Sequence, residues 1–388
     1  MDRFAEIRPY NDDEVRGVLD NLVANDEFIK TLAKLRFSKL DGYLPWLFRP
    51  LIRRALNKEI ATISDVRSFQ AHVTVYVKRI LHDTTKSFSV SHLERLEHGK
   101  TYLFMSNHRD ITLDPTLVNY ALFMDGHNTA RIAIGDNLLS KSFVADLMRL
   151  NKCFIVNRSA KGPRQALSAY KTLSAYIHHS LKEDKIPVWI AQREGRAKDG
   201  NDRTEPAIIK MLAISRDRKM ESFSEYINGL NIVPVSISYE YDPCDGVKAG
   251  ELYQKTEHGK YEKSEYEDLK SIGLGISGQK GDVQMCFGMP LEGDFDTPEA
   301  VAAAVDKQVI ENYVLHPSNF FAYQQLYGSI PDLNLGGGKF RPDSKRYKNR
   351  RQHFEKRINA LPPAYREYAL SIYANPVLNK LRITSTHF

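Results

Sequence analysis

Hydrophobic residues in the first 85 positions recur at steps of three and four, which is the spacing of one face of a helix. Asn11 and Asp12 stand just before the first such stripe and are residue types that cap helices. A second stripe runs through residues 64–82. The members are Val15, Val18, Leu19, Leu22 and Val23 in the first stripe and Val66, Phe69, Val73, Val77 and Ile80 in the second. The pattern predicts a helical N-terminal region over residues 1–85.

From about residue 86 the pattern changes to short apolar runs that alternate with helical stretches. The helical stretches lie near residues 115–124, 162–182 and 205–216, and residues 282–287 fit one more strand. The apolar runs occupy residues 102–105, 131–134, 153–156, 187–190 and 232–237. This alternation predicts an α/β domain over residues 86–297, with a largely parallel or mixed sheet flanked by helices.

The remaining residues, 298–388, have a predominantly helical pattern. Residues 298–327 are helical in spacing, Gly336 to Gly338 open a linker, and another helical pattern begins near Pro363. We therefore expect helical extensions at both the N-terminal and the C-terminal side of the α/β domain.

The positive charge of the chain is concentrated in one segment. The net charge is +7, and residues 339–357 hold nine basic and two acidic residues, a difference that accounts for all of it. A local excess of this kind indicates a docking surface for an anionic partner. A membrane surface and a nucleic acid both satisfy that description.

Several expected absences narrow the class of protein. The three cysteines are far apart in sequence, which argues against a disulfide framework and favours a reducing, cytosolic setting. The first residues lack a charged region followed by an apolar stretch, so we expect no signal peptide. No apolar run approaches the roughly 20 residues that span a bilayer. The twelve histidines show no HExxH or similar paired-ligand spacing, so no metal is expected.

The densest polar motif, residues 106–115, follows directly on the apolar run 102–105. It contains His108, Asp110 and Asp114, with Pro115 after the last. An imidazole that acts as a general base needs a carboxylate to fix its tautomer, and Asp114 or Asp110 can supply one. Asp114 followed by proline also resembles an ordinary helix start, and a lone histidine is often only a turn residue. Spacing alone leaves both interpretations open.

Two other motifs are discounted. Residues 108–110 read His-Arg-Asp, as in the catalytic loop of protein kinases, but the asparagine required five positions after the aspartate is replaced by Pro115. Residues 273–278 match GxGxxG but are followed by strand-like residues, so the dinucleotide-binding context is missing. We interpret residues 273–278 as a flexible turn.

Three further sequence features support a site at the ends of the predicted strands. Arg158 follows the run 153–156, and Glu194 and Arg196 follow the run 187–190, while residues 232–237 form an apolar run with a proline. The carboxyl ends of parallel strands meet at one edge of a sheet, so we expect these side chains near His108. Arginine there suits phosphate binding.

The order of these four blocks resembles the glycerolipid acyltransferase superfamily, over about residues 86–245. The matching residues are Asn107, His108, Asp114 and Pro115 in the first block, Phe154 to Arg158 in the second, Glu194, Gly195, Arg196, Lys198 and Gly200 in the third, and Val233 and Pro234 in the fourth. There are two departures. Five residues rather than four separate His108 from Asp114, and the third block begins Gln-Arg rather than Phe-Pro and is one residue shorter after Gly195.

The resemblance implies transfer of a fatty acyl group from an acyl thioester of coenzyme A or acyl carrier protein to glycerol 3-phosphate or 1-acylglycerol 3-phosphate. His108 would be the base and Asp114 its partner, with Asp110 as the alternative carboxylate. Arg158 and Arg196 would hold the acceptor phosphate, with Lys198 and Arg193 as weaker candidates, and Glu194 and Gly195 would shape the acceptor pocket. No cofactor is implied.

Other functions stay open at this stage. The acceptor can be a different lyso-lipid, or the chain can be a non-catalytic protein that binds membranes or nucleic acid, although an intact His108 argues against that. For the enzyme we expect a cytoplasmic protein, peripheral on the inner face of the membrane, and no nucleic-acid partner. Trp46 and Phe48, beside arginines in residues 44–56, and the basic segment 339–357 are the expected anchors to an anionic surface.

Overall fold

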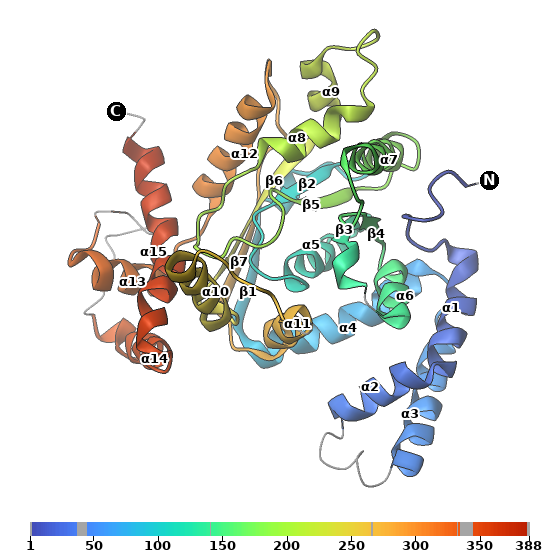
Figure 1. The fold of residues 1–388 in the computed structure, drawn as a ribbon, viewed down its shortest axis with the longest axis horizontal. Coiled ribbons are helices and arrows are strands. Elements are labelled where there is room, and N and C mark those ends of the chain that lie inside the picture. The colour runs from blue at the N-terminus through green and yellow to red at the C-terminus, as the bar shows by residue number, and fades with distance from the viewer. Residues whose placement is uncertain are drawn as a thin grey trace. The chain divides into compact units, whose positions relative to one another are not determined.

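The structure is a computed structural model that describes residues 2–36, 45–139, 141–264, 267–331, 333 and 344–385. The chain forms two compact units, and each is described by itself. Unit 1 comprises Met1–Tyr76 and Arg131–Tyr176, and unit 2 comprises Val77–Ala130 and Ile177–Phe388. Figure 1 labels the helices and strands along the chain. The domain boundaries predicted near residues 85 and 297 stay predictions.

Unit 1 packs helices around an apolar cluster and contains a short parallel strand pair. The predicted first stripe is buried, with Val15 and Leu19 among its least exposed members. Phe28, Ile52 and Phe143 complete this core. The elements are α1 (Asp12–Ala24), α2 (Asp26–Arg36), α3 (Pro45–Ile60), β3 (Arg131–Gly135), α6 (Ser142–Leu150) and β4 (Cys153–Val156). Two helices, α4 (Val66–Thr84) and α7 (Pro163–Lys182), lead from unit 1 into unit 2.

Within its described residues, unit 2 contains five strands in the order β1-β7-β6-β2-β5. Strand β2 lies between β5 and β6 and is parallel to both, whereas β6 and β7 are antiparallel. The bounds are β1 (Thr85–Ser91), β2 (Leu103–Ser106), β5 (Val188–Ala191), β6 (Ile232–Tyr239) and β7 (Gly281–Phe287). The predicted α/β class with a mixed sheet flanked by helices is therefore confirmed.

Strand β6 is internal to this sheet although it contains Pro234, a residue usually confined to edge strands. Pro234 lies opposite Met105 of β2, and pairing with β7 begins one residue later, at Val235. The missing N–H of the proline therefore falls just outside the antiparallel ladder. All eight residues of β6 are buried.

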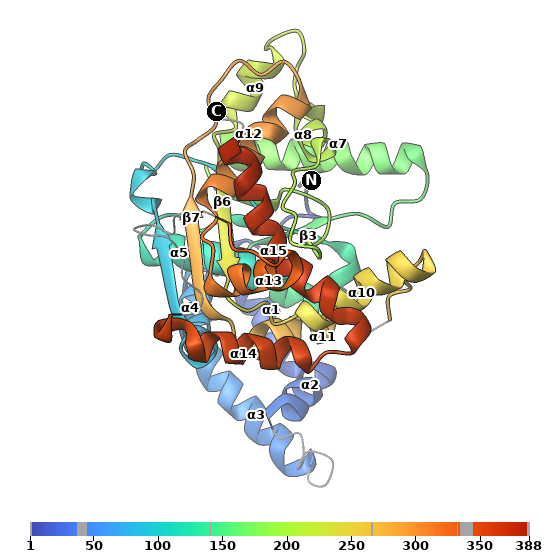
Figure 2. The ribbon, with the colours of Figure 1, turned by 90° about the vertical axis from the view of Figure 1, so that its left-hand side faces the viewer.

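The helices of unit 2 cover the sheet and build a second core at the C-terminal end of the chain (Figure 2). Phe320, Phe354 and Tyr373 lie in that core. The helices are α5 (Leu113–Met124), α8 (Pro206–Leu212), α9 (Phe223–Gly229), α10 (Asp245–His258), α11 (Glu267–Ser277), α12 (Pro298–Asn312), α13 (Pro317–Tyr327), α14 (Lys348–Asn359) and α15 (Pro363–Ser385).

The flexible turn predicted for residues 273–278 is wrong, because most of this stretch belongs to α11. Gly275 has a packing reason. A Cβ atom at this position would come within 2.1 Å of the Asp110 carboxylate, so α11 can approach the turn after β2 only with glycine there. The sequence motif was read as a loop because glycine disfavours helices, and tertiary packing overrides that preference.

The structure describes only parts of the two expected membrane anchors, residues 44–56 and the basic segment 339–357. Residues 339–343 and the side chain of Trp46 lie outside the described residues, and Phe48 is half-buried. In the basic segment, Arg350 pairs with Glu240 and Asp282, and Arg357 with Asp245. Phe354 is 0% exposed, so it belongs to the protein core and cannot enter a membrane from this position. No helix in the described ranges is both long and apolar enough to cross a bilayer.

Candidate active site

The turn that carries His108 is fastened to the sheet by Asn107. Its buried side chain connects the end of β2 to the backbone of β6. The Asn107 Oδ1 atom accepts from the Ile237 N–H at 2.8 Å, and Nδ2 donates to the Ile237 carbonyl at 2.9 Å. The same amide nitrogen donates to Asp202 at 3.1 Å. A fully buried side chain with three hydrogen bonds gives the following residue, His108, a fixed starting point.

His108 and Asp114 form a hydrogen-bonded pair at the mouth of β2. The Nδ1 atom of His108 lies 2.9 Å from Oδ2 of Asp114. The histidine side chain is 12% exposed and the aspartate side chain 0%. A substrate can therefore reach the imidazole, while water does not reach the carboxylate.

Asp114 is held by three donors besides His108. Its Oδ2 atom accepts from the backbone N–H groups of Arg109 at 2.6 Å and Asp110 at 2.9 Å. Its Oδ1 atom accepts from the Tyr239 hydroxyl at 2.7 Å. The turn wraps its own amides around the carboxylate, and this arrangement accommodates the extra residue between His108 and Asp114.

Asp110, the alternative partner, has a different position. Its Oδ1 atom accepts from the backbone N–H groups of Thr112 at 2.9 Å and Leu113 at 2.8 Å, as a helix cap does at the start of α5. Burial, followed by the nearby charge of Asp114, raises the pKa of this carboxyl. The structure thus brings Asp114 to the histidine and uses Asp110 to begin the helix.

A buried charge network lies behind the turn. Arg109 donates to Asp202 at 2.6 Å and to the Gly200 carbonyl at 3.2 Å. Lys248 of α10 donates to the Arg109 carbonyl at 2.7 Å and pairs with Asp242. These paired charges hold the turn in place from behind, although Arg109 Nε and Asp202 Oδ1 have no hydrogen-bond partner in the described residues.

Sequence reasoning missed most of these supporting residues. Tyr239, Asp202 and Lys248 are separated from His108 by many residues and carry no local signature. Arg109 was seen only as part of a discounted kinase-like tripeptide. Trp189 of β5 also contacts the site, with its ring 5.7 Å from that of His108 and its Nε1 donating to Ser106 at 3.1 Å.

The loop after β5 reaches the histidine through its backbone. The N–H of Ala197 donates to the His108 carbonyl at 2.9 Å. Gly195 has a φ of +71°, in the left-handed region that favours glycine, and both it and Glu194 are exposed. Gly200 has a φ of +81°, and a Cβ there would come within 2.2 Å of the Ile372 carbonyl oxygen, so only glycine fits.

The basic residues of this loop differ in the hydrogen bonds and ion pairs that they make within the protein. Arg196 is half-buried; its Nη2 atom donates to Ser271 at 3.4 Å, while its buried Nη1 has no hydrogen-bond partner among the described residues. Lys198 pairs with Glu251, and burial lowers its pKa. Arg193 lies 3.7 Å from Glu205. In the described residues Arg193 Nε likewise has no hydrogen-bond partner, so Arg196 and Arg193 each keep a donor for a ligand, whereas Lys198 is paired.

Arg158 belongs to unit 1 and is not part of the group that unit 2 assembles. Its backbone N–H donates to Asp136 at 3.2 Å, and its guanidinium lies beside Gly135 at the end of β3. The predicted role of Arg158 at the acceptor phosphate stays a prediction.

Comparison with known proteins agrees with the motif order. Residues 87–238 match the family model named Acyltransferase. No curated protein matches the chain. Among solved structures, one similar chain is the 1-acyl-sn-glycerophosphate (LPA) acyltransferase PlsC from Thermotoga maritima. It has 15% identity and a TM-score of 0.33, and the match covers 76% of this chain and 94% of that one.

The family model begins in β1 and ends in β6, so it spans β2, the His108–Asp114 pair and the loop after β5. The predicted resemblance to acyltransferases is thereby confirmed over residues 87–238, which match an acyltransferase domain.

Proposed function

We propose that the protein transfers a fatty acyl group from the thioester of coenzyme A or acyl carrier protein to a hydroxyl of glycerol 3-phosphate or 1-acylglycerol 3-phosphate. The observation that supports this most is the 2.9 Å contact between His108 Nδ1 and Asp114 Oδ2, which lies within the matched region. This contact would orient the His108 ring to act as a base at the mouth of a parallel strand.

In this reaction Asp114 accepts a hydrogen bond from the Nδ1–H of His108, which leaves Nε2 as the basic nitrogen. Nε2 removes the proton from the acceptor hydroxyl as its oxygen attacks the thioester carbonyl. The C–S bond then breaks, and the thiolate takes the proton back from the imidazolium. The Asp114 carboxylate stabilises the imidazolium, as in other histidine–carboxylate pairs. The net reaction exchanges a thioester for an oxygen ester and needs no cofactor.

The acceptor phosphate would bind at the loop after β5. Arg196 supports this assignment because its buried Nη1 lacks a partner among the described residues, and a guanidinium that holds a phosphate needs two donors. Glu194 and Gly195 would border the same pocket. Lys198 is less suited, since Glu251 already neutralises it.

A membrane is the expected place for this chemistry, since the acceptor or the product is a lipid. We place the protein on the cytoplasmic face as a peripheral protein. Exposed bases at Lys345, Arg346, Lys348 and Lys356 remain available to an anionic surface. Each is worth up to about 1 kcal/mol near anionic lipid, and salt weakens the attraction.

The proposal is tested by thiol release from palmitoyl-coenzyme A with purified protein and a panel of acceptors: none, glycerol 3-phosphate, 1-acylglycerol 3-phosphate and a lysophospholipid with a larger headgroup. A parallel series uses acyl carrier protein as the thiol carrier. We expect release that depends on a phosphate-bearing glycerol acceptor and yields a new oxygen ester. Transfer only to the larger lysophospholipid would replace the proposed acceptor with another lipid.

A further inference from the structure

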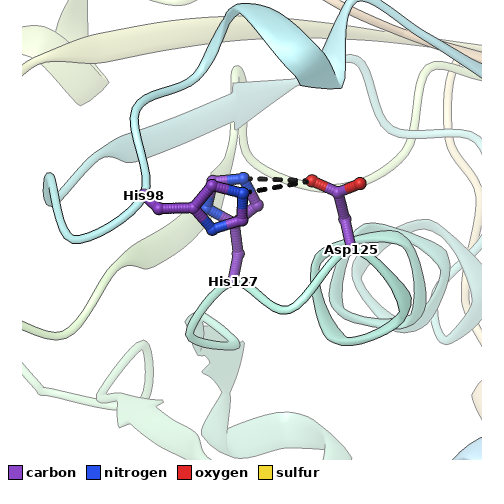
Figure 3. Close-up of side chains that lie close together, drawn as sticks. All are labelled: His98, Asp125 and His127. Atoms are coloured by element: carbon purple, nitrogen blue, oxygen red, sulfur yellow. Dashed lines mark ion pairs between the residues drawn. The ribbon is translucent and has the colours of Figure 1, made fainter.

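A second group of histidine and carboxylate side chains lies at the other end of α5 from Asp114. Asp125 is the first residue after α5, His127 follows two residues later, and His98 comes from the turn before β2. Figure 3 shows both imidazole rings directed at one oxygen of Asp125. The Nε2 atoms of His98 and His127 lie 3.9 Å and 3.3 Å from Oδ2 of Asp125.

The His127 ring is in an unusual state for a buried polar group. Its side chain is 6% exposed, and its buried Nε2 atom makes no well-aligned hydrogen bond to the described residues, although Oδ2 of Asp125 lies 3.3 Å away. An unsatisfied buried nitrogen costs about 1–3 kcal/mol, so a native structure normally supplies a partner.

We propose that His98, Asp125 and His127 bind a divalent transition-metal ion of the Zn²⁺ type. The ligand atoms are two imidazole nitrogens and one carboxylate oxygen, and all three lie within 4.8 Å of one another. Two nitrogen ligands favour zinc and related ions over magnesium or calcium, which prefer oxygen. Three protein ligands leave the fourth tetrahedral position to water.

The distances suit such an ion. At Zn–N and Zn–O bond lengths of about 2.0–2.1 Å, ligand atoms in a tetrahedron lie about 3.4 Å apart. The two contacts to Asp125 lie on either side of that value. The rings are stacked, with centroids 3.9 Å apart and planes inclined by 9°, so one ring must turn for both lone pairs to meet at the ion. His98, whose side chain is 64% exposed, is free to do so.

The ion would connect the start of β2 to the end of α5. Helix α5 has 12 residues, which corresponds to a length of about 18 Å, so the ion would lie far from the His108–Asp114 pair at the opposite end. It would therefore stabilise the two elements that carry the pair without taking part in acyl transfer. This inference is independent of the proposed function.

The test is a titration of untagged, chelator-treated full-length protein with Zn²⁺, read by calorimetry and by competition with a chromophoric chelator. Thermal unfolding is measured in parallel. Three variants accompany the wild type: His98→Ala, His127→Ala and His82→Ala. His82 is the matched control, because it also pairs with a neighbouring aspartate, Asp83, but has no third ligand in the described structure.

We expect one Zn²⁺ per wild-type chain, an affinity at least about 10-fold lower in His98→Ala and His127→Ala, and no change in His82→Ala. Zinc should raise the unfolding temperature of the wild type and of the control only, because it binds the folded state. His98 is exposed, so its variant should fold even if His127→Ala does not. Equal zinc affinity in the wild type and His98→Ala, or equal affinity for Ca²⁺ and Zn²⁺, would overturn the proposal.

Discussion

A histidine and an aspartate lie close together at each end of helix α5, but the two pairs differ in burial and in hydrogen bonding. At the N-terminal end, Asp114 is 0% exposed and accepts from His108, Tyr239 and two backbone amides. At the C-terminal end, the Asp125 side chain is 46% exposed, and the buried Nε2 of His127 lies beside it without a hydrogen bond.

The difference teaches that proximity of histidine and aspartate does not define a function. In the first pair, each acceptor position of the carboxylate is filled from within the protein, which orients one ring for proton transfer. In the second group, polar atoms are left over, and they converge on a point that a ligand can occupy. The filled carboxylate positions a base, whereas the second group leaves room for an ion.

The largest expected effect separates Asp114 from Asp110. Asp114→Asn should lower turnover about 10²–10⁴-fold, because an amide cannot hold the Nδ1–H tautomer and would oppose two backbone donors. Asp110→Asn should retain much more activity and change stability little, because the amide oxygen can still accept from the backbone N–H groups of Thr112 and Leu113. Steady-state kinetics and urea unfolding of both variants measure this. A mild Asp114→Asn with a severe Asp110→Asn would reverse the assignment.

Arg196→Ala should mainly weaken acceptor binding. Its guanidinium would contact the phosphate in the ground state and in the transition state alike, so its loss raises the acceptor KM by about 10-fold or more with a smaller change in kcat. Arg193→Ala is the control, since Arg193 already lies near Glu205. An increase confined to the KM of the acyl donor would assign Arg196 to the thioester side.

Tyr239→Phe tests how much the hydrogen bond from Tyr239 to Asp114 contributes to stability and turnover. The change removes the 2.7 Å hydrogen bond to Oδ1 and leaves that buried oxygen unpaired. We expect a loss of stability of about 1–3 kcal/mol and a modest decrease in kcat. Chemical unfolding beside turnover measurements gives both values. Unchanged stability would show that the fourth donor is dispensable.

The smallest expected effect concerns His316, a buried histidine with no carboxylate partner within hydrogen-bond reach in the described structure. Burial lowers its pKa to about 4, below its ordinary value near 6.5. The unfolded chain therefore binds more protons between these values, and stability falls as pH decreases from about 6.5 towards 4. The contribution at pH 5 is at most about 2 kcal/mol. Urea unfolding of wild type and His316→Gln at pH 7.5 and 5 should show a weaker pH dependence in the variant.

The sequence predicted the fold where the local pattern was decisive. The change of apolar spacing near residue 86 indicated strands, and β2, β5 and β6 lie where apolar runs were identified. It did not predict that Gly275 would sit inside a helix or that Phe354 would be buried, because both depend on distant partners. Gly275 faces Asp110, and Phe354 packs on Phe321 and Tyr373.

The candidate site could be predicted only in part for the same reason. The local motif contains His108 together with both candidate carboxylates, but the choice between Asp110 and Asp114 depends on how the turn folds its amides. Tyr239 and the His98–Asp125–His127 group have no sequence signature, because their members meet only through the fold. Metal sites show in a sequence mainly as short spacings between ligands, whereas His98 and His127 come from separate segments of the chain.

One measurement tests the central claim most directly: acyl transfer to the preferred acceptor by wild type, His108→Gln and His127→Gln, with folding verified by circular dichroism. His108→Gln should lose about 10²–10⁴-fold in kcat, because glutamine retains polarity but cannot accept a proton at neutral pH. His127→Gln should retain wild-type turnover in the folded protein. Near-normal turnover in a folded His108→Gln variant would contradict the assignment of His108 as the catalytic base.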